Sequence, residues 1–388
     1  MITKVIGIGA AGNKAAINLV EQKVIQQDSV LLINSTLRDI PEDYKGLKVE
    51  YANSYGGCGK ERKIAFDLAM NSLKEGTIPL NDFLKIGTEE EAELVIIVTS
   101  TEGGTGSGSS IVIGKYIKNV LGIEVHMFGF VGFQSDVRGL KNTVEWFSEL
   151  EEDFAVEAVD NSKYLPECRG NKIKAEKAAN ADFAKKVGIL IGNPIRYSEH
   201  NIDKTDLLKL SAKQHGFMII EAINFEKIKN KEQFEKVVIE MIDNSKSVDC
   251  NDIKSQRVGV FINISPASTD FISYEDILLE RYGEWYEKYE HIQHEADMPE
   301  FFAVVIAGIK MPVEEIQRVY SEYKERMDRV DKSKDNFFAA VGNLSLEDDD
   351  QFSIKDKKPK TVSADDFFGT MSTPKTTTQK KADITEEF

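Results

Sequence analysis

The chain has 388 residues, of which 41% are hydrophobic and 29% are charged, and it carries a formal net charge of −16. This composition predicts a soluble globular core, and the length suffices for two packed domains and a tail at roughly 150 residues per domain. Clusters of basic residues bind nucleic-acid phosphates, so the acidic balance argues against tight direct binding of DNA or RNA.

The sequence lacks the patterns of membrane and secreted proteins. No apolar run approaches the roughly 18 residues that a membrane-spanning helix needs, and the first residues lack a signal-peptide pattern. The three cysteines, Cys58, Cys168 and Cys250, are isolated and have neither zinc-ligand spacing nor a disulfide framework. We therefore expect a cytoplasmic protein with reduced thiols.

The first half of the chain alternates apolar runs with segments that suit helices. Runs that predict buried strands lie at residues 4–9, 29–34, 47–51, 94–99 and 124–131. Segments that predict helices lie at residues 10–20, 61–75, 111–121 and 139–154. Apolar strands separated by helices predict a parallel sheet that is covered on both faces.

The second half has a different pattern and predicts a smaller α+β unit. A long helix is predicted at residues 175–190, which ends before Asn193-Pro194. Further strands are predicted at residues 217–222, 258–264 and 301–309, and further helices at residues 231–244, 274–291 and 313–330. From about Asn343 the sequence is charge-alternating and of low complexity, which predicts a disordered tail. Its apolar islands, Asp366–Phe368 and Glu387-Phe388, are either docking peptides or parts of a solubilising tail.

Three glycine-rich segments each lie between a predicted strand and a predicted helix. We call them the first (Gly7–Asn13), second (Ser54–Lys63) and third (Thr99–Ser110) glycine segments. Glycine lets a backbone approach a phosphate closely, and backbone N–H groups at a helix N-terminus form an anion site. Three such segments along one parallel sheet predict a nucleoside triphosphate site at the carboxyl edge of that sheet.

Two common nucleotide sites fit this pattern less well. The first glycine segment matches the G-x-G-x-x-G of dinucleotide-binding folds, which leaves an NAD-dependent oxidoreductase as an alternative. Such folds place an acidic residue at the end of the second strand to hold a ribose, whereas this strand ends in Asn34. The P-loop signature is absent, because Gly59-Lys60 and Gly114-Lys115 are followed by glutamate and tyrosine.

Several motifs together resemble the tubulin/FtsZ superfamily of GTPases. The run GGTGSG at Gly103–Gly108 resembles the signature of that superfamily, and the first glycine segment is similar to its first phosphate loop. Asn34–Thr36 and Gly132–Arg138 lie where the family has an Asn-Thr-Asp motif and a loop near the ribose. Asn201–Asp206 reads N-x-D-x-x-D, which is similar to the family's loop that enters the nucleotide site of the next subunit. We call this last segment the acid loop.

The resemblance covers about residues 1–310 and implies an α/β fold of the tubulin/FtsZ type. That fold has a Rossmann-like parallel-sheet GTPase domain, a long central helix and a smaller α+β domain, followed here by an extended C-terminal helix and the tail. The boundaries we expect are 1–174 for the GTP-binding domain, 175–200 for the central helix and following loop, 201–310 for the second (activation) domain, 311–342 for the C-terminal helix and 343–388 for the tail.

The resemblance also implies a site for GTP or GDP with Mg²⁺, without metal ligands from the protein. The candidate nucleotide-binding residues are Gly9, Ala10, Ala11, Gly12, Asn13, Asn34, Gly57, Cys58, Gly59, Lys60, Gly103, Gly104, Thr105, Gly106, Ser107, Gly108, Asp136, Arg138, Asn161 and Asn180. Among these, Asn180 lies where the family reads the guanine base.

The catalytic candidates are Asn201, Asp203 and Asp206, and the resemblance implies that they act in trans on the nucleotide of a neighbouring subunit. Taken singly, these and other site residues have ordinary structural explanations. An aspartate of the acid loop suits the N-cap of a helix that continues into Leu207-Leu208, Lys60 and Arg138 suit surface charges, and Cys58 suits a small loop residue.

Within the superfamily, the chain resembles most the TubZ group of plasmid- and phage-borne tubulin relatives. This implies GTP-dependent head-to-tail filaments that segregate DNA, with a separate DNA-binding adaptor attached to the C-terminal tail and no direct membrane contact. The basic patches at Lys355–Lys360 and Lys380-Lys381 are candidate handles for the adaptor. An FtsZ-type cell-division scaffold is the alternative, although the tail lacks the terminal docking peptide of FtsZ.

Overall fold

A computed structural model describes residues 1–338 apart from 55, 151–153, 197, 199–200, 214–215 and 251–254. The predicted tail at 343–388, including Asp366–Phe368, Glu387-Phe388 and both basic patches, lies outside the described residues.

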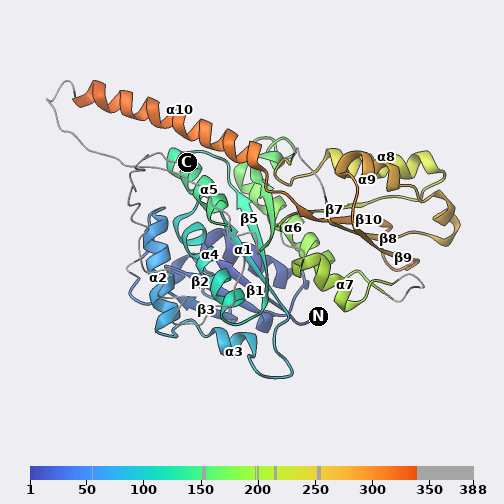
Figure 1. Ribbon diagram of the computed structural model, residues 1–388, viewed down its shortest axis with the longest axis horizontal. Coiled ribbons are helices and arrows are strands. Elements are labelled where there is room, and N and C mark those ends of the chain that lie inside the picture. Colours follow the sequence, from blue (N-terminus) through green and yellow to red (C-terminus); the bar gives the residue numbers. More distant parts are fainter. Residues whose placement is uncertain are drawn as a thin grey trace, which may run out of the picture.

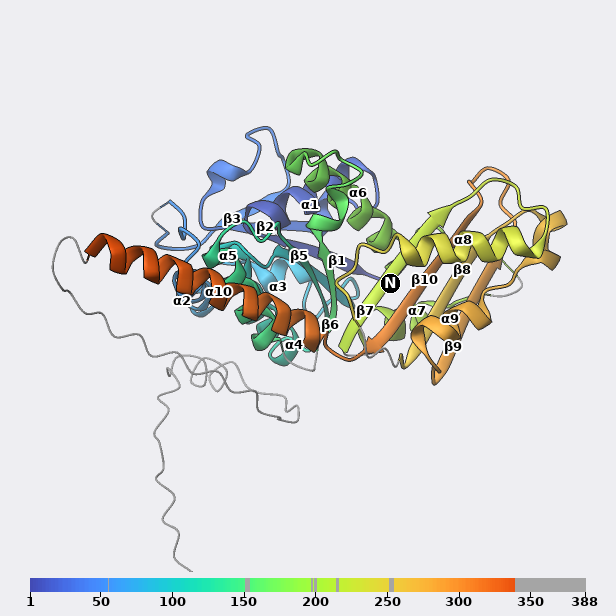
Figure 2. The ribbon, with the colours of Figure 1, turned by 90° about the horizontal axis from the view of Figure 1, so that it is seen from above.

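A mixed, mainly parallel sheet runs through the described part of the chain (Figures 1 and 2). Its strands are β1 (Thr3–Ile8), β2 (Val30–Asn34), β3 (Leu47–Glu50), β4 (Leu94–Ser100), β5 (Glu124–Val131), β6 (Ala155–Asp160), β7 (Gly216–Asn224), β8 (Arg257–Asn263), β9 (Glu287–Gln293) and β10 (Phe301–Ile309). The strand order is β3-β2-β1-β4-β5-β6-β7-β10-β8-β9. Strand β10 is antiparallel to β7 and β8, and the other neighbours are parallel.

Helices cover both faces of the parallel half, as the sequence predicts. The helices are α1 (Gly9–Glu21), α2 (Arg62–Lys74), α3 (Leu80–Leu84), α4 (Gly104–Asn119), α5 (Val137–Glu149), α6 (Lys172–Leu190), α7 (Lys204–Leu208), α8 (Lys231–Asp243), α9 (Glu275–Tyr282) and α10 (Val313–Phe338). On β1, Val5 faces a core formed with α1 and α6, whereas Ile6 faces a core formed with α2, α3, α4 and α5. This alternation follows from the two-residue period of a strand.

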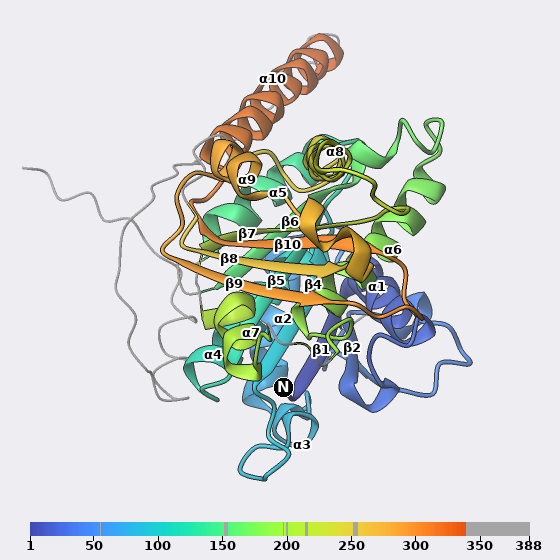
Figure 3. The same ribbon diagram turned by 90° about the vertical axis from the view of Figure 1, so that its right-hand side faces the viewer.

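The second half of the sheet also has covered faces (Figure 3). Phe234 of α8 and Leu278 of α9 pack against one face of β7, β10, β8 and β9. Leu190 at the end of α6 and Leu207 of α7 belong to a core on the other face. Helix α10 then leaves β10, packs beside α5 and projects past the body of the molecule (Figure 1).

Three helix predictions differ from the structure. The helix predicted at 139–154 ends at Glu149, and Ala155–Asp160 forms β6 in the middle of the sheet. The helix predicted at 274–291 is wrong in its second half, because α9 ends at Tyr282 and β9 follows. Gly283, directly after α9, adopts a φ of 72°, which glycine tolerates better than any other residue. The helix predicted at 111–121 begins earlier, at Gly104.

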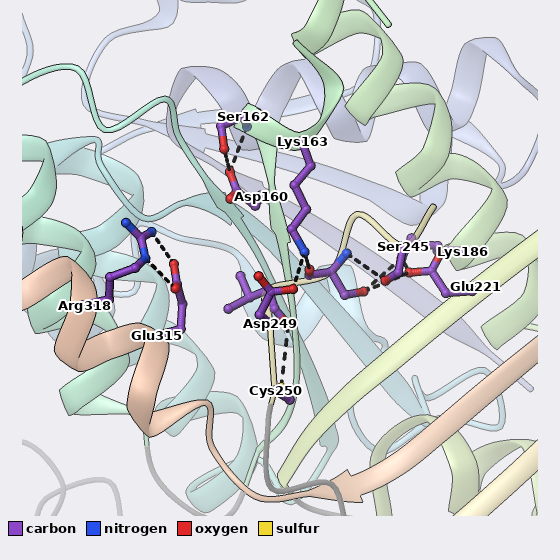
Figure 4. A network of polar contacts seen from close by, with 12 residues as sticks. Asp160, Ser162, Lys163, Lys186, Glu221, Ser245, Asp249, Cys250, Glu315 and Arg318 are labelled. Atoms are coloured by element: carbon purple, nitrogen blue, oxygen red, sulfur yellow. Dashed lines mark hydrogen bonds and ion pairs between the residues drawn. The ribbon is translucent and has the colours of Figure 1, made fainter. Parts of the chain in front are cut away.

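A buried lysine lies where the two halves of the sheet join (Figure 4). In the described part of the chain, β6 and β7 pair at Ala155–Gly216 and Val156–Phe217. Beyond them, Lys186 Nζ of α6 donates to Glu157 Oε1 of β6 at 2.7 Å and lies 3.4 Å from Glu221 Oε1 of β7. Lys186 is only 1% exposed and Glu157 is fully buried. Burial raises the pKa of Glu157 to about 7, although Lys186 opposes the rise.

We predict that Lys186→Met lowers the free energy of unfolding by about 3–5 kcal/mol, because it leaves two buried carboxylates without their cation. This loss of stability should grow between pH 6 and pH 8, since Glu157 without its cation has to keep a proton to stay buried, and keeping it costs more as the pH rises. Urea denaturation measures both effects. Lys185→Met, at the exposed neighbouring lysine, should change stability by no more than about 0.5 kcal/mol. Equal stability of the two variants would contradict a structural role for the cluster.

Candidate functional site

The predicted nucleotide-binding residues other than Asn180 lie in segments that follow the carboxyl ends of the parallel strands. The first glycine segment joins β1 to α1, the third joins β4 to α4, and the loop at residues 132–136 joins β5 to α5. The second glycine segment follows β3 and leads into α2, and Asn161 directly follows β6. Because β1 to β6 are parallel, the ends of these strands meet at one edge, where ligands of open α/β sheets bind.

The start of α1 touches both β4 and α4. Gly9 has a φ of 75°, and a Cβ there would lie 3.0 Å from the backbone nitrogen of Gly106. A Cβ at Gly12 would lie 2.2 Å from the carbonyl oxygen of Val98. These glycines allow backbone segments to approach more closely than any side chain would permit.

Asn13 provides an observation that points to a ligand. Its side chain is fully buried, and neither amide atom has a hydrogen-bond partner among the described residues. A buried amide left unpaired costs about 1–3 kcal/mol, so this position suits a polar group of a bound molecule. The Oδ1 atom of Asn161, at the end of β6, likewise has no partner in the described part of the chain.

The third glycine segment is helical where the sequence predicts a loop. Helix α4 begins at Gly104, and Gly103 before it has a φ of −75°. Gly104 and Gly108 of α4 are needed for close packing against α2 and the loop before it, and neither has a left-handed backbone conformation. A Cβ at Gly104 would lie 2.7 Å from Lys60 Cα, and one at Gly108 would lie 2.3 Å from the carbonyl oxygen of Arg62. The prediction that the backbone of Gly103–Gly108 forms a loop is therefore wrong, although the N-terminus of α4 still offers free N–H groups at the sheet edge.

The second glycine segment, by contrast, does use left-handed conformations. Gly56, Gly57 and Gly59 have φ values of 100°, 121° and 55°, and Lys60 has a φ of 65°. Cys58 is a buried free thiol in this loop.

Two ion pairs hold this loop against the start of α5. Lys60 Nζ pairs with Asp136, and Arg138 pairs with Glu61. Although burial raises it, the hydrogen bonds from Lys60 and from the Gly139 backbone lower the pKa of Asp136 below its usual value. All four charged side chains are partly exposed, and such pairs are worth about 0–1 kcal/mol, so a phosphate can replace the carboxylates at little cost.

The amides of Asn34 and Asn180 differ in their surroundings. Asn34 is almost fully buried, its Oδ1 accepts from the Ser35 backbone at 2.9 Å, and its Nδ2 donates to Asp39 at 3.1 Å. The side chain of Asn34 is thus occupied within the chain. Asn180 is half-buried on α6, the helix that shares a core with α1.

The acid loop lies at the opposite edge of the sheet. Lys204 of α7 pairs with Glu93 at 2.8 Å, and Glu93 directly precedes β4 (Figures 1 and 3). The seven residues of β4 separate the two edges by about 20 Å at ~3.3 Å per residue. The chain therefore does not bring the acid loop and its own glycine segments together.

Within the acid loop, the three candidates have local partners. Asp203 Oδ1 accepts from the backbone nitrogen of Asp206 at 2.9 Å, so Asp203 is the N-cap of α7. Asn201 Oδ1 accepts from the Ser198 backbone at 3.1 Å. Asp206 is half-buried and lies 3.5 Å from Lys209 Nζ. The catalytic role of these residues stays a prediction.

Sequence reasoning missed Glu102, the residue directly before Gly103. Its Oε1 accepts from the Gln134 backbone at 2.5 Å, and a Cβ at Gly132 would lie 2.3 Å from its Cδ. Burial raises the pKa of Glu102. The sequence does contain a clue to Glu102, because a carboxylate directly before an anion-binding motif would repel phosphate. Such a residue is compatible with a phosphate site only if its side chain is held away from the phosphates.

The described residues lack two further kinds of feature. They contain no cluster of three or more His, Cys, Asp or Glu side chains that could hold a metal ion. Within the same residues, no helix combines the length and the apolar character needed to cross a membrane.

No protein-family model matches the chain, and no curated protein matches it. Several solved structures do match it. TubZ of Clostridium botulinum phage c-st has 16% identity and a TM-score of 0.66, over 85% of this chain and 99% of that chain. CetZ2 from Haloferax volcanii, a GTPγS-bound protofilament, has 18% identity and a TM-score of 0.69, over 85% of this chain and 100% of that one. A GTPγS-form protofilament of TubZ from Bacillus thuringiensis serovar israelensis has 18% identity and a TM-score of 0.69, over 86% of this chain and 94% of that one. Identities this low show a shared fold.

We predict that Gly108→Ala destabilises the protein, by about 1–3 kcal/mol, because the new methyl group meets the backbone of Arg62. Helix propensity alone predicts the opposite sign, a gain of up to about 1 kcal/mol. Gly188→Ala in α6 is the matched control, since its nearest contact would be an ordinary 3.9 Å, and it should be neutral or stabilising. Chemical denaturation measures both. A stabilising Gly108→Ala would contradict the close contact between α4 and α2.

Proposed function

From the tubulin/FtsZ fold of this chain, we propose that it is a GTPase that forms head-to-tail filaments and hydrolyses GTP at subunit interfaces. One observation carries this proposal. The glycine segments and the acid loop occupy opposite edges of one sheet, so neither edge holds a complete site. Stacking subunits head to tail places the acid loop of one over the glycine segments of the next, and a heterologous contact of this kind that does not close produces a filament.

We infer that the nucleotide phosphates bind to backbone N–H groups at the starts of α1 and α4. Lys60 and Arg138 would exchange their carboxylate partners for phosphate oxygens, and the buried amide of Asn13 would gain the partner that it lacks. Asn161 and Asn180 are the candidates for the sugar and the guanine base.

A bound Mg²⁺ would neutralise phosphate charge. Since the described residues hold no acidic cluster for it, phosphate oxygens and water are its natural ligands.

In this proposal, the acid loop orients and polarises the attacking water. Asp206 is the stronger candidate, because its carboxylate does not cap the helix and pairs with Lys209 alone among the described residues. Asp203 uses one carboxylate oxygen to cap α7, and its other oxygen could contact the water. Asn201 stabilises the loop conformation through its hydrogen bond with the Ser198 backbone. Hydrolysis would then weaken the interface that made it possible, which gives filament turnover.

The similar structures support guanine nucleotide and self-assembly, since two of them are GTPγS protofilaments. We further propose that the filaments segregate plasmid or phage DNA through a DNA-binding adaptor on the tail. The net charge of −16 favours indirect contact with DNA. A cell-division scaffold of the FtsZ type is the alternative. Fluorescently labelled protein in host cells distinguishes the two, because filaments that move with DNA support segregation and rings at mid-cell support division.

We predict that Asp206→Asn lowers the GTP hydrolysis rate per assembled subunit by about 10²-fold or more, while filaments still form and persist longer. Hydrolysis per subunit in the wild type should rise steeply above a critical concentration, because the site is completed by assembly. Phosphate release and electron microscopy with GTP, GDP and a non-hydrolysable analogue measure these effects.

Asp243→Asn, at an exposed position at the end of α8, is the control and should match the wild type. Asp203 should be tested as Asp203→Asn, because asparagine keeps the N-cap that alanine would remove. A rate that is independent of protein concentration would exclude catalysis in trans.

A further inference from the structure

Helix α10 lies beside the loop at residues 132–136, which joins β5 to α5 at the edge of the candidate site. Helix α10 runs beside α5 (Figure 2), and Val319 of α10 packs against Leu140 and Val144 of α5 in a small apolar cluster. This packing fixes the arginine side chains of α10 next to the loop.

Gln134 is the point where the helix and the loop meet. Its φ of 51° is left-handed, a conformation that is unfavourable for a residue with a side chain and that needs support from neighbours. Its backbone carbonyl accepts from Arg326 Nη1 at 2.8 Å, and its side-chain amide lies 3.4 Å from Arg318 Nη2. Both arginines belong to α10, so this helix supports the strained residue on two sides.

The other side of Gln134 reaches the start of α4. The backbone N–H of Gln134 donates to Glu102 Oε1 at 2.5 Å. Asn142 Nδ2 donates to the backbone carbonyls of Glu102 at 2.9 Å and of Lys60 at 3.0 Å. A continuous path of contacts therefore runs from α10 through Gln134 to the residues that line the candidate phosphate site.

We propose that Arg326 is a positioning residue that couples the docking of α10 to nucleotide binding. This inference rests on the proposed function. By holding the carbonyl of Gln134, Arg326 keeps the N–H of Gln134 aimed at Glu102, and the carboxylate of Glu102 stays turned away from the phosphates. When this contact is lost, a negative charge is free to face the anion site and nucleotide binding weakens.

The coupling has to act in both directions. If a docked α10 strengthens nucleotide binding by some factor, bound nucleotide strengthens the docking of α10 by the same factor. A partner that pulls on the C-terminal segment would therefore be felt at the nucleotide site of the same subunit.

The test measures the affinity of the full chain for fluorescently labelled GDP, below the concentration at which it assembles. We expect Arg326→Gln to weaken binding about 5- to 10-fold, at the lower end of typical coupling between sites. Arg329→Gln is the matched control, because Arg329 is 73% exposed and pairs only with Glu325 among the described residues. Its affinity should equal that of the wild type.

Two further readouts separate positioning from loss of stability. In hydrogen–deuterium exchange, GDP should increase the protection of α10 in the wild type but not in Arg326→Gln. Glu102→Gln removes the charge that Arg326 restrains, so the double variant should bind GDP more tightly than Arg326→Gln alone.

Unchanged affinity in Arg326→Gln, with or without a lower melting temperature, would overturn the inference and leave the proposed function standing. An equal loss in Arg329→Gln, or no recovery in the double variant, would also overturn it. Failure of the wild-type chain to bind GDP would overturn both the inference and the proposed function.

Discussion

The constraint on which the site depends is the contact distance between helix α4 and its neighbours. Its first turns carry glycine where any Cβ would enter the backbone of the second glycine segment or of β1 and β4. This short contact distance brings the backbone N–H groups of the first, second and third glycine segments close together. A site made of backbone donors owes its geometry to how closely segments cross, whereas one made of side chains can adjust through rotamers.

A second constraint lies at the joint between the halves of the sheet. Among the described residues, two residue pairs connect β6 to β7, and Lys186 with its buried acidic partners fills the region beyond them. Lys186 also belongs to α6, the helix that carries Asn180 and ends in the same apolar core as Ile202 of the acid loop. One helix and one ionic cluster therefore contribute to the relative placement of the two edges, together with the ion pair of Lys204 and Glu93.

Much of the fold could be predicted from the sequence because most of its strands are apolar runs, and the motif GGTGSG indicated the fold type. The errors have physical causes. The glycines of α4 have low helix propensity, and only tertiary packing explains their helical state. In β6, the run AVEAVD is short and gives no clear periodicity.

The pairing of Arg326 with Gln134 spans 192 residues, so no spacing pattern reveals it. The candidate site was predicted as a set of segments, but the occupied amide of Asn34 and the unpaired amide of Asn13 required coordinates.

The ion pairs of Lys60 with Asp136 and of Arg138 with Glu61 have a consequence for how the protein senses its solution. The two cations already have counterions of their own, supplied by the chain. Added salt weakens the attraction between these cations and an incoming anion. It also weakens the attraction between the cations and the carboxylates that the anion has to replace. Under the proposed function, the exchange of these carboxylates for phosphate would therefore depend less on ionic strength than the binding of an anion to two unpaired cations.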